Sequence, residues 1–313
     1  MLNMNASARV TSDPLVSVII PSYRMGKFVK VALESVAAQS YKNWEVILVD
    51  DCGPEDGTRE AVAEFVSGHP SKRVKYIRNA ENVGCGHSRN IAIAEARGEF
   101  LALLDPDDFW HPCHLEFALQ GIGEADLCFL HCRSVDEEGN DRGQHLGGRM
   151  KELEDAFPRS LFSENFLLPS STVMRHDVIH RVGGFATREH ALNAADWDFY
   201  LRCVGAGTKF VFLPEETCHY RRHKGAATSN YLVITRECTR VLRRNRQSAR
   251  GRMRSDLTDS LHGHLCKLAY LQVSFRDWEG LRAAGEALLL KPLNIAPFVQ
   301  VVKGLRNNWK NQC

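Results

Sequence analysis

The chain has 313 residues and a formal net charge of +2, because 40 lysines and arginines nearly balance 38 aspartates and glutamates. This length allows one large domain or a domain with an appendage, and the ordinary composition excludes a largely disordered chain. The balanced charge argues against a general nucleic-acid binder. The ten cysteines include no CxxC pair, so we expect reduced thiols and a cytoplasmic location rather than a disulfide framework or a zinc cluster.

Residues 1–14 lack the apolar core of a signal peptide. No uninterrupted apolar run of about 18 residues occurs in the chain. We therefore expect a protein that does not span a membrane, with the inner face of the membrane as the alternative to a free cytoplasmic location.

Short apolar runs alternate with helical patterns through the first third of the chain. The predicted strands are Leu15–Ile20, Trp44–Val49, Val74–Ile77 and Phe100–Leu104, and the predicted helices are Lys27–Gln39, Gly57–Ser67 and His87–Ala96. This alternation predicts an α/β fold with a mostly parallel sheet and right-handed crossovers. The polar residues after the first, second and fourth strands should then share one edge of the sheet.

The regular alternation of strand and helix patterns ends after residue 110. Further apolar segments, Asp126–Cys132, Leu167–Met174 and Thr208–Leu213, stand among turn-rich stretches, with predicted helices at His176–Val182 and His190–Val204 and a polar tail at His219–Asn230. From residue 231 onward we predict a basic helical linker, dense in arginine over Arg236–Arg254, and then a helical hairpin around Asp277. The expected domains are therefore an N-terminal tail (1–14), an α/β domain (15–230) and a helical appendage (231–313).

The stretch Gly98–Trp110, GEFLALLDPDDFW, combines a buried-strand pattern with three carboxylates, Asp105, Asp107 and Asp108. Pro106 ends strand pairing because it removes a backbone donor. Open α/β sheets bind ligands beyond the carboxyl ends of their strands, and clustered carboxylates repel unless a cation lies among them. The pattern favours a metal that holds a phosphorylated substrate, although Asp and Pro are also ordinary turn formers.

Other candidate side chains have two interpretations each. Asp50 and Asp51 can bind a base or ribose, or cap a turn, and Arg89 can face a diphosphate from a helix start or be a solvated helix residue. The loop NVGCGHSRN is not a dinucleotide fingerprint, because Arg89 stands where a third glycine is needed.

Asp196 also has two interpretations, as a proton acceptor or as a helix cap. His219 and His223 are ligands or solvated histidines, and the arginine-rich stretch meets an anionic surface or forms a charged helical face.

Four motifs together resemble the inverting nucleotide-sugar glycosyltransferases of family two. They are VSVIIPSY, WEVILVDDCGPEDGT, NVGCGHSRNIAIAEARGEFLALLDPDD and AADWDFYLRC, in this order, within Leu15–Asn230. The resemblance implies a Rossmann-like GT-A fold, a nucleotide-sugar donor, usually UDP-linked, and Mg²⁺ or Mn²⁺.

Matched position by position, the resemblance assigns Pro21, Tyr23 and Asp51 to the nucleoside. Asp105 and Asp107 match the DxD motif, with Asp107 as the metal ligand and Asp105 nearer the ribose or diphosphate. Asp196 matches the catalytic base, which would deprotonate an acceptor hydroxyl for inverting attack on the anomeric carbon. One position departs from the pattern, because Ala195 stands where the family commonly has an acid.

The sequence therefore predicts a metal-dependent inverting glycosyltransferase acting on a glycan or lipid-linked acceptor, with no nucleic-acid partner. The basic C-terminal region is a candidate for peripheral membrane association. Two other functions were weighed. A sugar-nucleotide pyrophosphorylase is disfavoured, because no glycine-rich loop with a following arginine and lysine accompanies the first strand. A non-catalytic nucleotide-sugar binding or assembly protein is suggested by Ala195.

Overall fold

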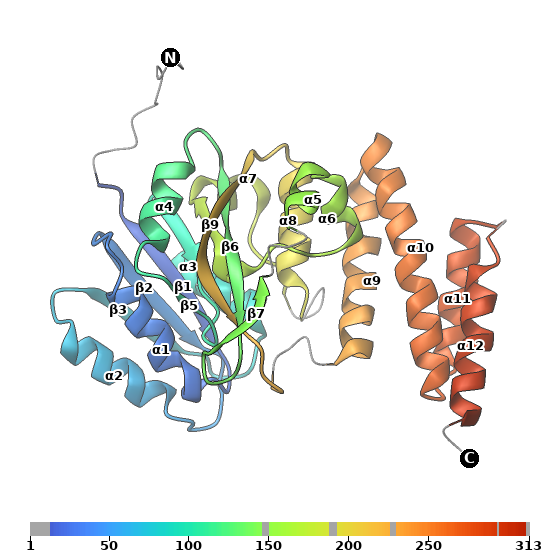
Figure 1. Ribbon diagram of the computed structural model, residues 1–313, viewed down its shortest axis with the longest axis horizontal. Coiled ribbons are helices and arrows are strands. Elements are labelled where there is room, and N and C mark those ends of the chain that lie inside the picture. Colours follow the sequence, from blue (N-terminus) through green and yellow to red (C-terminus); the bar gives the residue numbers. More distant parts are fainter. Residues whose placement is uncertain (1–12, 146–149, 188–192, 226–229, 293, 311–313) are drawn as a thin grey trace.

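The computed structural model describes residues 13–145, 150–187, 193–225, 230–292 and 294–310. A central sheet with helices on both faces forms one end of the molecule, and a group of helices forms the other end (Figure 1). The predicted α/β class and the C-terminal helical region are both confirmed.

The first half of the sheet is parallel, as the sequence predicts. Its strands are β1 (Val16–Ser22), β2 (Trp44–Asp50), β3 (Arg73–Arg78) and β4 (Phe100–Leu103), in the spatial order β3-β2-β1-β4. Every residue of β1, β2 and β4 is buried, which explains why these strands read as continuous apolar runs rather than alternating ones. Ser22 pairs with Asp50, so the residues that follow β1 and β2 meet at one edge.

The sheet continues beyond β4 with mixed strand directions. The further strands are β8 (Thr172–Arg175), β6 (Leu127–Val135), β9 (Phe210–Arg221) and β5 (Phe109–Trp110) in spatial order, with β7 (Asp141–His145) beside β6. Two predictions were wrong here. The turn-rich stretch that follows Cys132 contains β7 within its described part, and β9 continues through Pro214 to Arg221, although the sequence predicted a strand that ends at Leu213.

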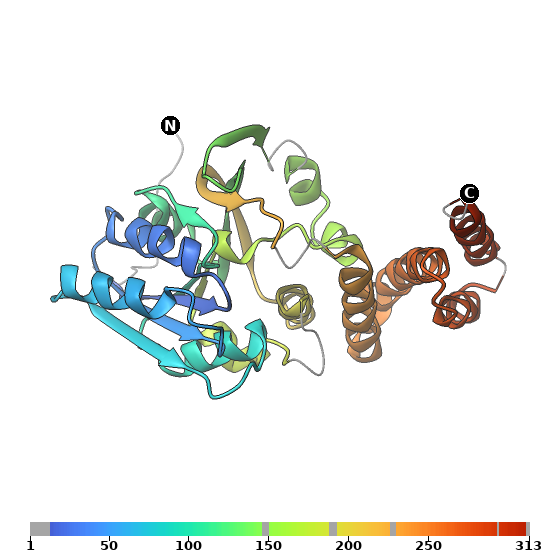
Figure 2. The same ribbon diagram turned by 90° about the horizontal axis from the view of Figure 1, so that it is seen from below.

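Helices cover both faces of the sheet (Figure 2). The helices α1 (Gly26–Ala37), α2 (Thr58–Gly68) and α4 (His114–Gly121) share one buried cluster, whereas α3 (Cys85–Ala94), α7 (Asp177–Val182) and α8 (Ala195–Gly205) share another. In β1 the alternation of strand side chains sends Val18 and Ile20 to the first cluster and Ile19 to the second. The turn η2 (Pro169–Ser171) precedes β8.

The remaining helices extend the molecule away from the sheet. They are α5 (Met150–Asp155), α6 (Arg159–Ser163), α9 (Tyr231–Ser248), α10 (Gly251–Ser274), α11 (Glu279–Leu290) and α12 (Ala296–Lys310). Of these, α9 packs against α8, α10 against α9, and α11 and α12 against α10 (Figure 1). The sequence predicts the basic helix and one hairpin but not α12. No helix in the described part of the chain is long and apolar enough to cross a membrane.

Candidate functional site

The acidic stretch leaves the sheet at the end of β4, as the sequence predicts. The amide of Leu104 donates to the carbonyl of Ile19 at 3.0 Å and so keeps the chain beside β1 until the turn begins. The amide of Asp108 then donates to the carbonyl of Asp105 at 3.0 Å and closes that turn. The turn gives the three carboxylates three different environments.

Asp105 forms an ion pair with Arg89, which lies in the first half of α3. The Arg89 side chain is buried and its guanidinium also lies over the ring of Phe185, so the interpretation of Arg89 as a solvated helix residue is wrong. Burial raises the pKa of Asp105, and the Arg89 cation opposes that rise. The pair places a fixed positive charge against the first carboxylate of the turn.

Asp107 faces His223, which follows β9. The Nε2 atom of His223 lies 3.0 Å from Oδ2 of Asp107, and both side chains are largely buried. The His223 ring packs against Phe28 with a centroid distance of 4.9 Å, so the interpretation of this histidine as solvated is also wrong. A carboxylate oxygen and an imidazole nitrogen that face each other suit a divalent transition-metal ion, so of the two ions that the resemblance implies this donor set fits Mn²⁺ better than Mg²⁺, which prefers oxygen ligands.

Asp108 stabilises the acidic turn through hydrogen bonds to other segments. Its carboxylate is buried and accepts hydrogen bonds from Ser170 Oγ and, at 2.9 Å, from the backbone amide of Arg221. Burial holds the pKa of Asp108 well above its ordinary value, and the charges of Asp107 and Asp105 add to this effect. Asp108 thus ties the acidic turn to η2 and β9, leaving Asp105 and Asp107 as the partly accessible carboxylates.

The residues assigned to a nucleoside lie after β1 and β2. Pro21 is buried within β1, whereas Tyr23 is exposed with the Arg24 guanidinium 5.1 Å from its ring centroid. Arg24 and Cys52 both have a φ of 58°. Left-handed backbone at non-glycine residues is uncommon and concentrates at functional sites, which agrees with a ligand-binding role for this edge.

Asp51 has a more structural setting than the sequence suggested. Its carboxylate is buried and accepts from the Asn79 side chain at 2.8 Å and from the amides of Val83 and Gly84 at 2.9 and 2.7 Å. These bonds fix the loop that leads into α3. Through that loop, Asp51 helps to position Arg89.

Asp196 lies in the first turn of α8, and Asn165 donates to its Oδ2 at 2.9 Å. Dense surrounding protein raises the pKa of Asp196 above its ordinary value, and the Arg89 charge and the Asn165 bond oppose that rise. The start of the helix predicted at His190 lies outside the described residues, and in the described part α8 begins at Ala195.

Ala195 packs closely against helix α3. It is buried, and a Cβ added at Gly86 of α3 would lie 2.9 Å from the Cβ of Ala195 and 2.1 Å from the carbonyl oxygen of Ala186. The two helices therefore touch at Gly86 and Ala195. This contact brings Arg89, one turn along α3, toward Asp196.

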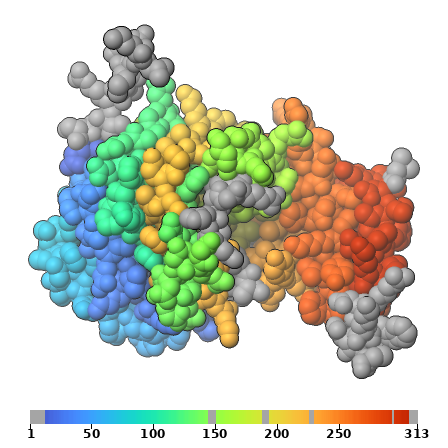
Figure 3. Space-filling view, in the orientation of Figure 1, coloured from blue at the N-terminus to red at the C-terminus, as the bar shows by residue number. Residues whose placement is uncertain are grey.

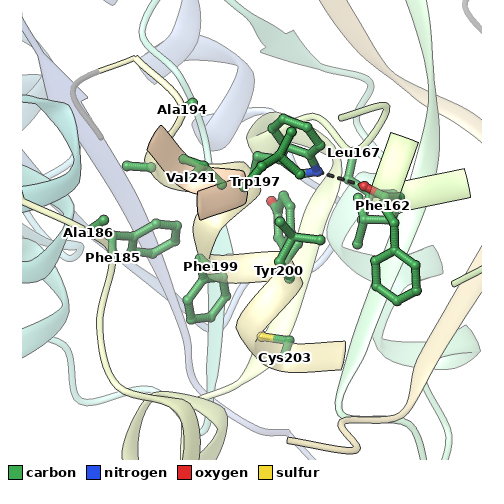
Figure 4. Packing of buried hydrophobic residues seen from close by; sticks show 14 of the residues in the cluster. Phe162, Leu167, Phe185, Ala186, Ala194, Trp197, Phe199, Tyr200, Cys203 and Val241 are labelled. Carbon is green, nitrogen blue, oxygen red and sulfur yellow. Dashed lines mark hydrogen bonds between the residues drawn. The ribbon is translucent and has the colours of Figure 1, made fainter. Parts of the chain in front are cut away.

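The inner side of α8 is anchored by packing and by polar bonds. Trp197 donates from Nε1 to the carbonyl of Leu161 at 2.7 Å, and Phe199 and Tyr200 fill the core beside it (Figure 4). Asp198 is fully buried and accepts from Arg202 Nε at 2.8 Å and from Asn245 of α9 at 2.9 Å. The sequence alone assigns no role to Asp198 and Asn245, because their contact joins segments 47 residues apart.

Comparison with known proteins agrees with this geometry. Residues 17–183 match the family model for glycosyl transferase family 2. An uncharacterized glycosyltransferase of Methanocaldococcus jannaschii, MJ1057, is 29% identical over 212 residues, which are 66% of this chain and 71% of that protein. The Escherichia coli protein WfgD, a UDP-Glc:alpha-D-GlcNAc-diphosphoundecaprenol beta-1,3-glucosyltransferase, is 35% identical over 119 residues, which are 38% of this chain and 45% of that relative.

Two solved structures share the fold over almost the whole chain. TarS of S. aureus, residues 1–349 in complex with UDP-GlcNAc, has a TM-score of 0.69 at 18% identity and covers 95% of this chain and 91% of its own. The mannosyltransferase PcManGT of Pyrobaculum calidifontis, in complex with GDP-Man and Mn²⁺, has a TM-score of 0.64 at 17% identity, with coverages of 97% and 89%. The likeness includes the C-terminal helices.

Proposed function

Since this chain belongs to glycosyl transferase family 2 and is a glycosyltransferase that acts on nucleotide-sugar donors, we propose that it is a metal-dependent inverting enzyme. The donor is a UDP-sugar, and the acceptor is a hydroxyl of a glycan or of a lipid-linked sugar. The observation that carries the proposal is the convergence of Asp107 with His223, and of Arg89 with Asp105 and Asp196, on one edge of the sheet.

The donor side of the site uses Asp107 and His223 as ligands of Mg²⁺ or Mn²⁺. The ion would neutralise charge on the departing diphosphate. Arg89 and Asp105 form a rigid charged pair, which we assign to the diphosphate and ribose. The exposed Tyr23, beside Pro21, offers a ring for the nucleobase, while Asp51 holds the loop that orients Arg89.

Asp196 acts as the general base. Its carboxylate takes the proton from the acceptor hydroxyl while the hydroxyl oxygen forms a bond to the anomeric carbon. The bond between that carbon and the diphosphate oxygen breaks on the opposite face, so the configuration inverts and the electron pair leaves with the nucleoside diphosphate. The raised pKa of Asp196 makes it a stronger base than an ordinary carboxylate, while the Arg89 charge and the Asn165 hydrogen bond favour its ionised form.

The acceptor and the compartment are proposed on similar grounds. WfgD is named for transfer from UDP-Glc to a diphosphoundecaprenol-linked sugar, which supports a UDP-sugar donor and a lipid-linked acceptor. The cysteines of the described segments carry free thiols, which suits the reducing cytoplasm. Ala195 favours a second candidate, a nucleotide-sugar binding protein without turnover.

Three substitutions test the proposal. Asp196→Asn should lower transfer by about 10²- to 10⁴-fold while calorimetric donor affinity is unchanged, whereas Asp107→Ala should abolish the dependence of donor affinity on Mn²⁺. Asp177→Asn is a matched control, because Asp177 is an exposed carboxylate in the first turn of α7. Full transfer by Asp196→Asn would exclude the assigned base. Donor binding without turnover over an acceptor panel would favour the second candidate.

A further inference from the structure

The outermost helix, α12, has an unusual distribution of apolar side chains. Its inner face, Pro297, Val301 and Gly304, is buried against α10, and a Cβ added at Gly304 would lie 2.9 Å from the carbonyl oxygen of Tyr270. The opposite face should be polar in a helix that simply covers a core. It is apolar instead.

We use the term α12 face for five exposed apolar residues: Phe298, Val299, Val302 and Leu305 on this outer side, and Ile295 directly before the helix. Phe298 is 58% exposed and Val302 is 48% exposed. Their spacing of three and four residues places them along one stripe of the helix. Figures 2 and 3 show α12, coloured dark red, at the end of the molecule opposite to α2.

The charged residues of this C-terminal segment have one sign. Residues 292–313 include Lys303, Arg306 and Lys310 and contain no aspartate or glutamate. Lys303 is exposed beside Val302. An apolar stripe in a helical segment whose charged residues are all basic is typical of helices that lie in the headgroup layer of a membrane.

Several arginines of the stretch that the sequence suggested for this role pair with acidic side chains of neighbouring helices instead. Arg243 of α9 bonds to Glu286 of α11, with 2.7 Å between Nε and Oε1. Arg244 pairs with the buried Asp198 at 3.5 Å, and Arg236 pairs with Asp277. These arginines join α9 to its neighbours, so α12 is the better surface for an external anion.

We propose that the α12 face docks on the surface of an anionic lipid bilayer, with the helix parallel to the membrane plane. The helix of 15 residues is about 22 Å long, too short to cross a hydrocarbon core of about 30 Å. A second copy of the chain is a poorer occupant, because a twofold contact through this stripe would bring like charges together. Docking would hold the enzyme at the surface where a lipid-linked acceptor resides.

Vesicle co-sedimentation with the full chain tests this inference without any sugar donor, so its outcome is independent of the proposed reaction. The protein should bind vesicles of phosphatidylcholine mixed with phosphatidylglycerol, bind pure phosphatidylcholine weakly, and dissociate as salt increases. Val302→Asp should weaken binding by roughly tenfold or more, and Lys303→Glu by about fivefold.

Val66→Asp is the matched control, because Val66 is 41% exposed and belongs to α2, the helix at the opposite end of the molecule from α12 (Figure 2). It should bind vesicles as the unmodified chain does. Phe298→Ser removes apolar area without adding charge, so it should also weaken vesicle binding, and it tests the inference if Val302→Asp does not fold. The inference would be overturned if the unmodified chain did not bind anionic vesicles, or if Val302→Asp and Val66→Asp lost vesicle binding to the same extent. A dimer in light scattering that Val302→Asp dissociates would also overturn it, when the unmodified chain binds no vesicles.

Discussion

Replacing Gly86 by alanine should disrupt the contact on which the site depends. In an ordinary helix this change stabilises by about 1 kcal/mol. Here the new Cβ would lie 2.1 Å from the carbonyl oxygen of Ala186 and 2.9 Å from the Cβ of Ala195. A backbone oxygen cannot rotate away as the end of a long side chain can, so either α3 or the segment that carries Ala186 must move.

That segment is held in place by Asn90. Its Nδ2 donates to the carbonyl of Phe185 at 2.9 Å, and its Oδ1 accepts from the amide of Phe185 at 2.7 Å. Overpacking costs about 1–3 kcal/mol, and each hydrogen bond contributes about 1 kcal/mol. After the helix gain is subtracted, Gly86→Ala should lower the free energy of unfolding by about 2–4 kcal/mol.

The same displacement should also impair transfer. Arg89 lies three residues after Gly86, and Asp196 directly follows Ala195, so a separation of the helices moves the donor side away from the base. A misplacement of about 1 Å can lower a rate by about 10²-fold. Urea denaturation and transfer kinetics measure the two effects. Gly263→Ala is the control, since Gly263 is exposed in α10 with nothing within 4 Å of the new Cβ. Equal stability and turnover in both variants would refute this reasoning.

Two further predictions concern α8. Asn245→Ala should lower the free energy of unfolding by about 1–3 kcal/mol, because it leaves one oxygen of the buried Asp198 without its 2.9 Å donor. Thermal melts measure that loss, and transfer should fall although Asn245 lies outside the acidic turn. Asn165→Ala removes a hydrogen bond to the Asp196 anion, so the pKa of the base should rise further. Because the base acts when deprotonated, the acid limb of the pH–rate profile should move to higher pH. An unmoved limb would contradict the role of Asn165.

Local patterns in the sequence were sufficient for the first half of the fold. Strands β1, β2 and β4 are buried on both faces, and their apolar runs carry that information in a few consecutive residues. The helices between them have the spacing of one-sided burial, which is equally local. The convergence of polar strand ends followed from parallel pairing alone.

The contacts that define the site are not local. The contact between Asp107 and His223 joins positions 116 residues apart, and it requires β9 to continue past Pro214 to Arg221. The burial of Arg89 likewise depends on Asp105 and on Phe185 from a distant loop. Neither the residue types nor their periodicity in one sequence distinguish these side chains from solvated ones.

Helix α8 explains why the C-terminal helices belong with the catalytic site. Its first turn presents Asp196 and contacts α3 through Ala195, while its inner side binds α9 through Asp198 and Asn245. One cluster of buried side chains runs without interruption from Ile19 of β1 to Val301 of α12. The boundary that we propose at residue 230 therefore divides the chain by role rather than by packing. Removing the helices beyond it would expose the buried carboxylate of Asp198 and release the helix that carries the base.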